Sequence, residues 1–536
     1  MISRGARALV ALLIVLVVVA NLRSLYVFPM PDSARWWGDE TGQIIELKTE
    51  LQEGHARIPI GLGSTVGISN GLLRGNSWLA AFLYGEPARL FADAADLVLI
   101  GRTVTAVLSV ALLLTLYLSA RRFGVNDLAA MLAALMLLAS RSFLFASHAA
   151  RLDIAAGLAA LITIAYLSRK YQQLREKSWS PTVRWWFIFG VVMLSEATLS
   201  IHLLTLLAPV ALFAMIKLGA VTNWKFALAA LGGVATLAFV LIAVYHFSGA
   251  PMTVLGATGE HTQFHSVIEE IPIMKLFSRS AQLSNIVQRW HGMWQEAPAI
   301  LVVVILALGS FVSLWKKLKF GYAESFVLYS SILLLIAWLL FQSYAIYYYM
   351  QILPVVILAA FIVLCKTMEL LPRAIVGNIV LAGIAAAVAH FGFYDALNAG
   401  AAGRRLTLAN VAALEQMVAT PGFQQGTPTV VVQNPALAWM LQHTTARVMS
   451  AHFLEFPLDR KSPSEVLREQ KAEYILIYTD PVDTNYALEY APLKHIADSI
   501  GILSATATGA LFDAGRSYWH RDASRIDTLR LYKLTW

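Results

Sequence analysis

Long apolar stretches alternate with short polar connections along most of the chain. A helix that crosses a bilayer needs about 20 predominantly apolar residues. Stretches close to this length predict about 11 spans, at residues 8–26, 96–118, 127–147, 153–168, 183–199, 201–217, 225–246, 298–315, 324–342, 346–365 and 374–394. The first span follows Arg4 and Arg7 and also fits a signal peptide, but the distribution of basic residues favours a retained helix. The pattern therefore predicts an all-α polytopic membrane domain over residues 1–394.

Three longer polar segments interrupt this pattern, at residues 29–95, 247–298 and 395–536. The last of them contains short apolar stretches that predict strands at 429–433, 474–478, 504–512 and 529–534, and helical patterns at 435–442 and 463–471. Strands that alternate with helices are typical of small α/β domains. We therefore expect a C-terminal soluble α/β domain over residues 395–536.

The charge distribution orients the predicted spans. Only 14% of residues are charged, against about 25% in soluble domains. Alternate connections carry the basic residues, as the positive-inside rule requires of cytoplasmic loops: Arg121 and Arg122; Arg169, Lys170, Arg175 and Lys177; Lys217 and Lys225; Lys316, Lys317 and Lys319; Lys366 and Arg373. This orientation places the three long segments outside the cytoplasm and explains the net charge of +8 without a nucleic-acid partner. The single cysteine excludes an internal disulfide.

An acidic pair, Asp39 and Glu40, follows the first predicted span on the outer side, next to Trp36 and Trp37. Carboxylates beside a bilayer are costly unless they are hydrated or bind something. A carboxylate can deprotonate an attacking hydroxyl, and indole rings stack on sugars and lie well at a membrane interface. The pair is a candidate catalytic site, and a solvated loop is the alternative.

A second candidate is the segment 147–153, which contains His148, Arg151 and Asp153 at the outer end of the third and fourth spans. Arginine binds phosphate through two parallel hydrogen bonds, so Arg151 is a candidate phosphate ligand. Asp153 is either a carboxylate of the same site or a helix N-cap that pairs with Arg151.

The loop 247–298 holds a third set of candidates. His261 and His265 are four residues apart and would share one face of a helix, as metal ligands do, although polar interfacial histidines are the favoured interpretation. Lys275, Arg279 and Arg289 are better candidates for neutralising a phosphate leaving group.

The aromatic segment 342–349 forms the outer turn before the span that contains Pro354. Its tyrosines, Tyr347 among them, either line a site or form an ordinary interfacial belt. Glu196 and His202, near the outer turn between the fifth and sixth spans, either line a cavity or are hydrogen-bonded core residues.

In their order and sidedness these features resemble the GT-C glycosyltransferases, which take sugar from a polyprenyl-phosphate donor. The resemblance covers about residues 1–400. It includes the acidic pair after the first span, the Arg-x-Asp of 151–153, the aromatic segment before Pro354 and the stretch 97–124. The tail resembles the extracytoplasmic α/β domains of bacterial members. The family includes the lipid A aminoarabinose transferase, protein O-mannosyltransferases and actinobacterial arabinosyl- and mannosyltransferases.

The resemblance implies inverting transfer of a single sugar to a lipid, glycan or protein acceptor outside the cytoplasm of a bacterium, by a multi-pass protein of the inner (plasma) membrane. It implies Asp39 as general base and Glu40 as a second carboxylate. The donor and acceptor contacts would come from Trp37, His148, Arg151, Asp153, Lys275, Arg279, Arg289 and Tyr347. No cofactor is certain, because some members bind a divalent metal and others do not.

Two other classes fit the composition. A lipid-linked oligosaccharide ligase or polymerase would usually place its main outer loop late in the chain, whereas the acidic loop here comes first. A transporter would place charges at the centres of its spans and often shows internal repeats. Here the span centres are nearly free of charge, with Arg141 of the third span as the main exception, and no repeat is visible. The sequence therefore favours a glycosyltransferase.

Overall fold

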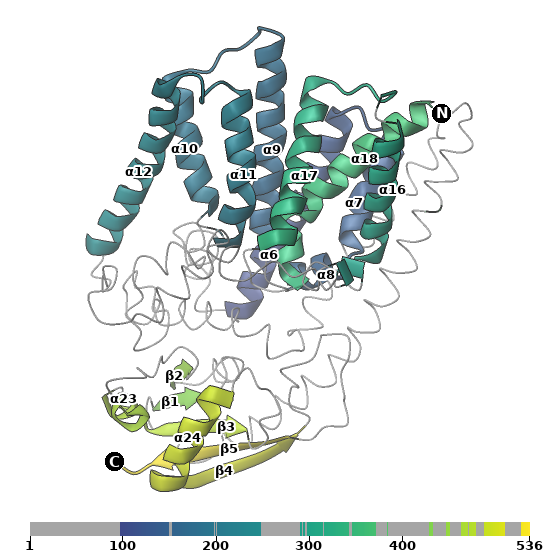
Figure 1. Cartoon of the computed structure of the whole chain (residues 1–536). Coiled ribbons are helices and arrows are strands. Elements are labelled where there is room, and N and C mark those ends of the chain that lie inside the picture. The colour runs from purple at the N-terminus through teal and green to yellow at the C-terminus, as the bar shows by residue number, and fades with distance from the viewer. Residues whose placement is uncertain are drawn as a thin grey trace.

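The computed structural model of the chain describes residues 97–148, 153–197, 199, 201–247, 290–291, 293–294, 297–314, 316–341, 346–370, 383, 428–432, 446–450, 462–469, 471–478, 487–509 and 527–536. These residues form a set of roughly parallel and antiparallel helices, followed by a small sheet with two helices (Figure 1).

In the described part of the chain the helices fall on the predicted spans, although two of these spans are divided. They are α6 (Leu97–Arg122), α7 (Asp127–Leu138), α8 (Arg141–His148), α9 (Asp153–Arg175), α10 (Val183–Ala197), α11 (Ile201–Lys217), α12 (Trp224–Phe247), α16 (Pro298–Leu314), α17 (Tyr322–Phe341) and α18 (Leu353–Leu370), with a 3-10 helix, η2, at Ile346–Gln351. The predicted spans 8–26 and 374–394 lie outside the described residues, except for Gly383.

The predicted span 127–147 is not one continuous helix, and Ser140 shows why. Its hydroxyl donates to Leu137 O at 2.7 Å, at the end of α7, and accepts a hydrogen bond from Phe143 N at 3.2 Å, in the first turn of α8. Serine side chains compete for backbone groups in this way and favour helix ends over helix interiors. The chain therefore changes direction between α7 and α8.

The predicted span 346–365 is also divided. Its first residues form η2, and the α-helix begins at Leu353 with Pro354 in its first turn. Proline is tolerated there because the first N–H groups of a helix have no intrahelical acceptor. Every residue from Leu353 to Cys365 is buried, so α18 is a central helix of the bundle.

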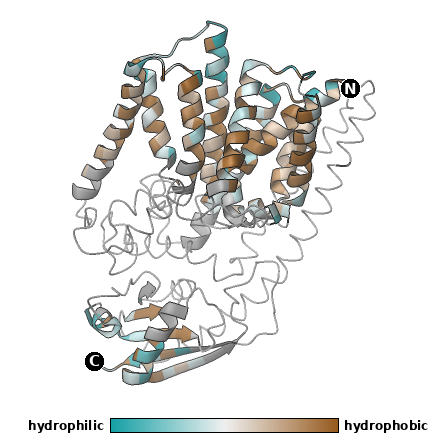
Figure 2. Cartoon of the chain, in the orientation of Figure 1, coloured by the Kyte–Doolittle hydropathy of each residue, from teal (hydrophilic) through white to brown (hydrophobic). Residues whose placement is uncertain are grey.

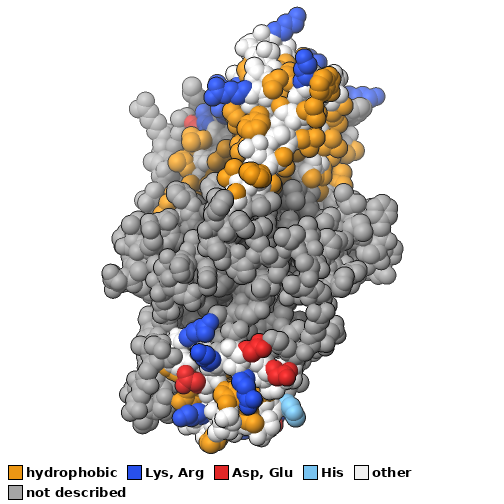
Figure 3. All heavy atoms as spheres, turned by 90° about the vertical axis from the view of Figure 1, so that its left-hand side faces the viewer, with side chains coloured by type: hydrophobic (Ala, Val, Ile, Leu, Met, Phe, Trp, Pro, Cys, Tyr) orange, Lys and Arg blue, Asp and Glu red, His pale blue; other side chains and the backbone are white. Residues whose placement is uncertain are grey.

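Among the described residues, three helical segments are long and apolar enough to cross a membrane: Thr103–Arg122, Tyr322–Leu339 and Leu353–Leu370. Shorter apolar helices lie beside them, and the hydrophobic colouring follows the helices over most of their length (Figure 2). Large apolar side chains point outward, among them Phe239 of α12 at 71% exposure and Val312 of α16 at 72%. Figure 3 shows apolar side chains spread over one flank of the helices. Such a surface fits lipid and not water.

Basic side chains gather at one end of this helical part. This holds for each Lys and Arg between residues 97 and 370 whose side chain is described. All of them lie close to the connections that follow α6, α9, α11, α16 and α18, either within a few residues of the connection or at the start of the next helix. Blue side chains accordingly mark the upper end of the helices in Figure 3. The predicted alternation is therefore seen in the structure, while the assignment of this end to the cytoplasm stays a prediction.

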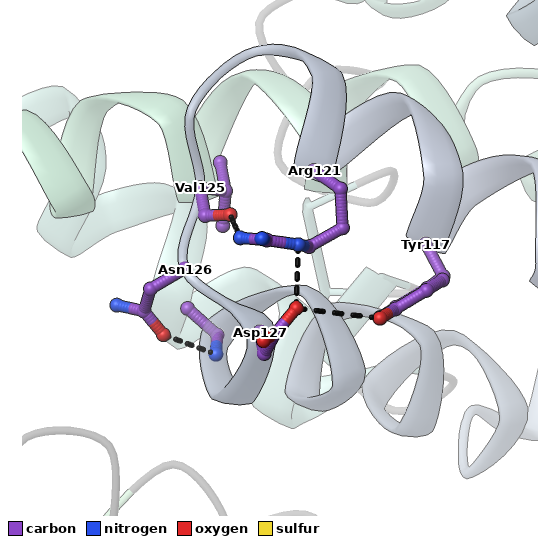
Figure 4. A network of polar contacts seen from close by, with 6 residues as sticks. Tyr117, Arg121, Val125, Asn126 and Asp127 are labelled. Carbon is purple, nitrogen blue, oxygen red and sulfur yellow. Dashed lines mark hydrogen bonds and ion pairs between the residues drawn. The ribbon is translucent and has the colours of Figure 1, made fainter. Parts of the chain in front are cut away.

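The turn between α6 and α7 shows how such a connection is held (Figure 4). Arg121 Nε lies 2.5 Å from Asp127 Oδ1, and the same guanidinium donates to Val125 O at 2.6 Å. The Asn126 side chain caps α7 by accepting from Ala129 N at 2.9 Å. Arg121 therefore stabilises the turn in addition to contributing to the pattern of basic residues.

Two glycines bring α10 and α12 into backbone contact. A Cβ added to Gly190 would lie 1.9 Å from Ala230 O, and one added to Gly233 would lie 2.0 Å from Phe187 O. Small residues at helix interfaces are typical of membrane proteins, where close packing replaces the hydrophobic driving force. The helices α10 and α12 therefore form a tightly packed pair.

We expect Gly233→Ala to force this pair apart and to lower stability by about 1–3 kcal/mol, the usual cost of overpacking. The matched control is Gly232→Ala on the same helix, because its Cβ would meet only a Phe187 ring carbon at 3.9 Å. Thermal unfolding of the detergent-solubilised protein measures both variants. Equal melting temperatures would contradict the close packing of the pair.

The described residues of the C-terminal part form a five-stranded mixed sheet. Its strands are β1 (Thr429–Val432), β2 (Arg447–Ser450), β3 (Tyr474–Tyr478), β4 (Gly501–Gly509) and β5 (Asp527–Leu534). The order is β2-β1-β3-β5-β4, with β1 parallel to β2 and β3, and β5 antiparallel to β3 and β4. Two helices, α23 (Pro463–Glu469) and α24 (Ala487–Ile500), contribute to one core with Ile475 and Ile477 of the central strand.

The predicted α/β character of the tail is confirmed, with corrections. The strand predicted at 504–512 begins three residues earlier, because Gly501–Gly509 pairs along its length with β5. The helix α24 and the strand β2 were not predicted. The helix predicted at 435–442 lies outside the described residues. The domain boundary at residue 395 stays a prediction.

Candidate functional site

The described residues of two predicted segments, 147–148 and Asp153 of one and 346–349 of the other, belong to elements that meet at the end of the helical part opposite the basic connections. The helix α9 begins at Asp153 and ends at Arg175, beside a basic connection. Asp153 therefore lies about 30 Å along the helix from the basic end. The short helix η2 contacts both α8 and α9 there. The site is therefore built from the end of α8, the start of α9 and η2.

Asp153 is the carboxylate at the centre of this junction. Its residue is 4% exposed, and its Oδ1 accepts a hydrogen bond of 3.3 Å from Nε2 of Gln351, which is fully buried. Asp153 is also the first residue of α9, where the helix dipole stabilises a negative charge. A buried carboxylate requires such compensation, because burial of an unpaired charge is costly.

The close approach of η2 to α9 depends on Gly157, one turn after Asp153. A Cβ at this position would lie 2.3 Å from Met350 O, inside the contact distance of any real side chain. Met350 is the neighbour of Gln351, so the absence of a side chain at Gly157 allows the Gln351 amide to reach the carboxylate.

A second contact holds η2 against α17. Tyr349 is 1% exposed, and its ring centroid lies 5.0 Å from that of Trp338 in α17. Aromatic pairs at this separation add to the stabilisation from burial alone. The residues that precede α18 are therefore held between α9 and α17.

The other predicted site residues are described only in part. His148 is the last residue of α8 and Tyr347 lies in η2, but their side chains lie outside the described part of the chain. The remaining candidates are not described at all: Trp37, Asp39, Glu40, Arg151, His261, His265, Lys275, Arg279 and Arg289. Within the described residues, no group of three metal-ligating side chains is found, so a metal site at His261 and His265 stays untested.

Sequence reasoning did not single out Gln351. It lies two residues beyond the aromatic segment, at the start of an apolar span. A polar residue at the beginning of a buried helix was the available signal. The partner of such a residue is not visible in the sequence, because Asp153 is 198 positions away.

A second buried carboxyl group lies deeper in the helical part. Glu196 of α10 is 8% exposed, and its Oε1 accepts a hydrogen bond from the Thr163 hydroxyl of α9. Its Oε2 is buried and has no hydrogen-bond partner among the described residues. Ionisable groups within membrane-spanning helices usually face the interior and find a partner there, and Thr163 supplies one such contact between α9 and α10.

We expect Thr163→Val to lower the free energy of unfolding by about 1–3 kcal/mol, because the buried carboxyl would lose its donor while the side-chain shape is kept. Thr163→Ser keeps the hydroxyl and serves as the control. Both are compared by thermal unfolding in detergent. If the valine variant unfolds no earlier than the serine variant, the hydrogen bond does not stabilise the helical part.

Comparisons with known proteins bear on the fold. No protein-family model matches the sequence, and no curated protein sequence matches it. Among solved structures, ArnT from Cupriavidus metallidurans bound to undecaprenyl phosphate aligns over 98% of both chains, with a TM-score of 0.51 and 15% identity. The apo state of the same protein aligns over 97% of both chains, with a TM-score of 0.51 and 14% identity.

An oligosaccharyltransferase from Archaeoglobus fulgidus, in complex with zinc and sulfate, covers 86% of this chain and 67% of its own, with a TM-score of 0.48 and 14% identity. The two ArnT structures carry the fold assignment. The chain has an ArnT-like GT-C fold, as the sequence resemblance predicted, and is an integral membrane protein.

Proposed function

We propose that this protein is a membrane glycosyltransferase that moves a single sugar from a polyprenyl-phosphate donor to a lipid, glycan or protein acceptor outside the cytoplasm. The observation that carries the proposal is the structural match over nearly the whole chain to an ArnT bound to undecaprenyl phosphate. The buried Asp153, at the end away from the basic connections, supports a polar site on that face.

In the proposed reaction the acceptor hydroxyl attacks the anomeric carbon of the sugar, and the bond from that carbon to the phosphate oxygen breaks. Asp39 accepts the hydroxyl proton as general base, and Glu40 lies beside it as a second carboxylate. The polyprenyl phosphate leaves with the bonding electron pair, and the configuration is inverted. Its negative charge needs stabilising as it departs.

The candidate cations for this stabilisation are Arg151, Lys275, Arg279 and Arg289. Asp153 carries a negative charge of its own and is a poor phosphate ligand, so we assign it to hydroxyl groups of the donor sugar. Trp37, His148 and Tyr347 are the proposed remaining contacts to donor or acceptor.

We place the acidic loop and the C-terminal part on the extracytoplasmic side of a bacterial inner membrane. The basic connections lie at the end of the described helices away from Asp153, and such loops face the cytoplasm. A reporter fused after Trp536 is expected to be active only as an extracytoplasmic enzyme, such as a phosphatase. A cytoplasmic location would reverse the sidedness of Asp39 and contradict the proposal.

The donor class tests the function. Purified protein is supplied with radiolabelled short-chain polyprenyl-phosphate pentoses and hexoses, with a bacterial membrane extract as the source of acceptor. A parallel reaction receives the matching nucleotide sugars without a lipid carrier. We expect transfer only from a lipid-phosphate donor. Transfer from the nucleotide sugar alone rules the proposal out, and transfer only of a diphosphate-linked oligosaccharide identifies a ligase or polymerase instead.

A further inference from the structure

We propose that Gln351 is a positioning residue that orients the Asp153 carboxylate toward the sugar of the donor. This inference rests on the proposed function and adds to it a residue from a separate part of the chain. It follows from the hydrogen bond that joins η2 to the start of α9.

The contact is buried on both sides. Gln351 has no exposed surface, Asp153 is 4% exposed, and Nε2 of the amide lies 3.3 Å from Oδ1 of the carboxylate. Burial on both sides leaves the amide and the carboxylate little freedom to rotate. The hydrogen bond therefore fixes the direction of the Asp153 oxygens relative to η2.

The backbone of Gln351 is itself fixed. Met350 O rests against the bare Cα of Gly157 in α9, and Tyr349 packs on Trp338 in α17. The chain then continues directly into α18, whose first residues are fully buried. Gln351 is thus held by two neighbouring helices, and its side chain transmits that position to Asp153.

The Gln351 amide can orient the Asp153 carboxylate but cannot neutralise its charge. An amide donates a hydrogen bond but carries no charge, whereas Lys or Arg at this position would form an ion pair. The contact from Gln351 therefore orients the Asp153 carboxylate without neutralising it. An ionised carboxylate accepts hydrogen bonds from hydroxyl groups and repels phosphate, so the group that it recognises is a sugar hydroxyl.

The first test replaces Gln351 with methionine, which has a similar length and no donor. We expect the KM for the polyprenyl-phosphate sugar to rise about 10- to 100-fold, as for loss of a hydrogen bond to a charged group. Binding of undecaprenyl phosphate, which has no sugar, is expected to stay within about twofold of wild type, since other residues meet the phosphate. If Gln351 had only a structural role, its replacement would weaken the binding of both ligands.

The control for this change is Gln172→Met. Gln172 is an exposed residue of the same helix α9 that carries Asp153, and its Nε2 donates to Glu176 Oε1 at 2.8 Å. The substitution removes the same kind of amide-to-carboxylate hydrogen bond at the far end of the helix. We expect an unchanged KM for this variant.

The second test exchanges the two groups. In the double variant Asp153→Asn and Gln351→Glu the summed side-chain length is the same, and the amide of residue 153 donates to the carboxylate of residue 351. We expect the exchange to restore the melting temperature lost in Asp153→Asn alone, but not the donor KM, because the negative charge has moved to η2.

Three results overturn the inference: an unchanged donor KM in Gln351→Met, an equal loss of undecaprenyl phosphate binding, or full recovery of KM in the exchanged pair. Failure of the proposed function is distinct from all three, since it appears as absence of transfer by the wild-type protein. Each test compares the KM or the ligand affinity of a variant with that of the wild-type protein.

Discussion

Asp39→Asn is expected to lower the rate of sugar transfer by ~10²–10⁴-fold, the usual loss when a general base is removed. Asparagine is nearly isosteric with aspartate but cannot accept the proton from the acceptor hydroxyl. The effect should appear mainly in kcat, with the donor KM changed little, because Asp39 acts on the acceptor during bond formation. Single-turnover transfer from a polyprenyl-phosphate sugar measures it directly.

The control for this variant is Asp498→Asn. Asp498 is an exposed residue of α24 that pairs with Lys494 one turn away, and surface pairs of this kind contribute little to stability. Its kcat should equal that of wild type. Turnover by Asp39→Asn at a near wild-type rate would remove Asp39 from the role of base, and Glu40→Gln would then be the next variant to measure.

Gly157→Ala is expected to lower kcat/KM by about 10²-fold, a loss typical of a displacement of about 1 Å within a site. The added methyl would lie 2.3 Å from Met350 O, so η2 must move away from α9. The Gln351 amide moves with it and no longer orients Asp153. The loss should therefore fall largely on the donor KM.

Gly309→Ala provides the matched control, because a Cβ at this α16 position meets nothing within 4 Å. Alanine is favoured over glycine within helices by about 1 kcal/mol, so this variant should be at least as stable as wild type and fully active. If Gly157→Ala retains wild-type kcat/KM, the close approach of η2 to α9 has no bearing on transfer.

The sequence predicted most of the helical part because its signals are local. An apolar stretch of membrane length is visible within a window of about 20 residues. The strand Tyr474–Tyr478 was predicted with its observed limits for a similar reason, since its sequence YILIY is β-branched and aromatic. Ser140 and Pro354 carried the information that two spans are divided, but a hydropathy pattern alone does not weigh single residues.

The elements that were missed have weak local signals. The strand Arg447–Ser450 has four residues and gains its identity from pairing with β1. The helix Ala487–Ile500 contains Pro492, a residue that argues against a helix interior, and it forms because Leu493, Ile496 and Ala497 pack on the sheet.

The candidate site was predicted in parts and not as a whole. The segments 147–153 and 342–349 were both singled out, but the contact of η2 with α8 and α9 depends on how α9, α17 and α18 pack, which is a long-range property. The roles of Gly157 and Gln351 follow only from that packing. Asp39 and the loop cations remain predictions from the sequence and the resemblance.

The most direct test of the account is an experimental structure of the protein with bound undecaprenyl phosphate. We predict that the phosphate lies at the end of the helices that carries Asp153, with room for a sugar between the phosphate and the carboxylates of Asp39 and Asp153. We expect it to contact one or two of four basic residues: Arg151, Lys275, Arg279 and Arg289. A phosphate bound at the end of the basic connections, on the opposite side of the membrane from Asp153, would contradict the account.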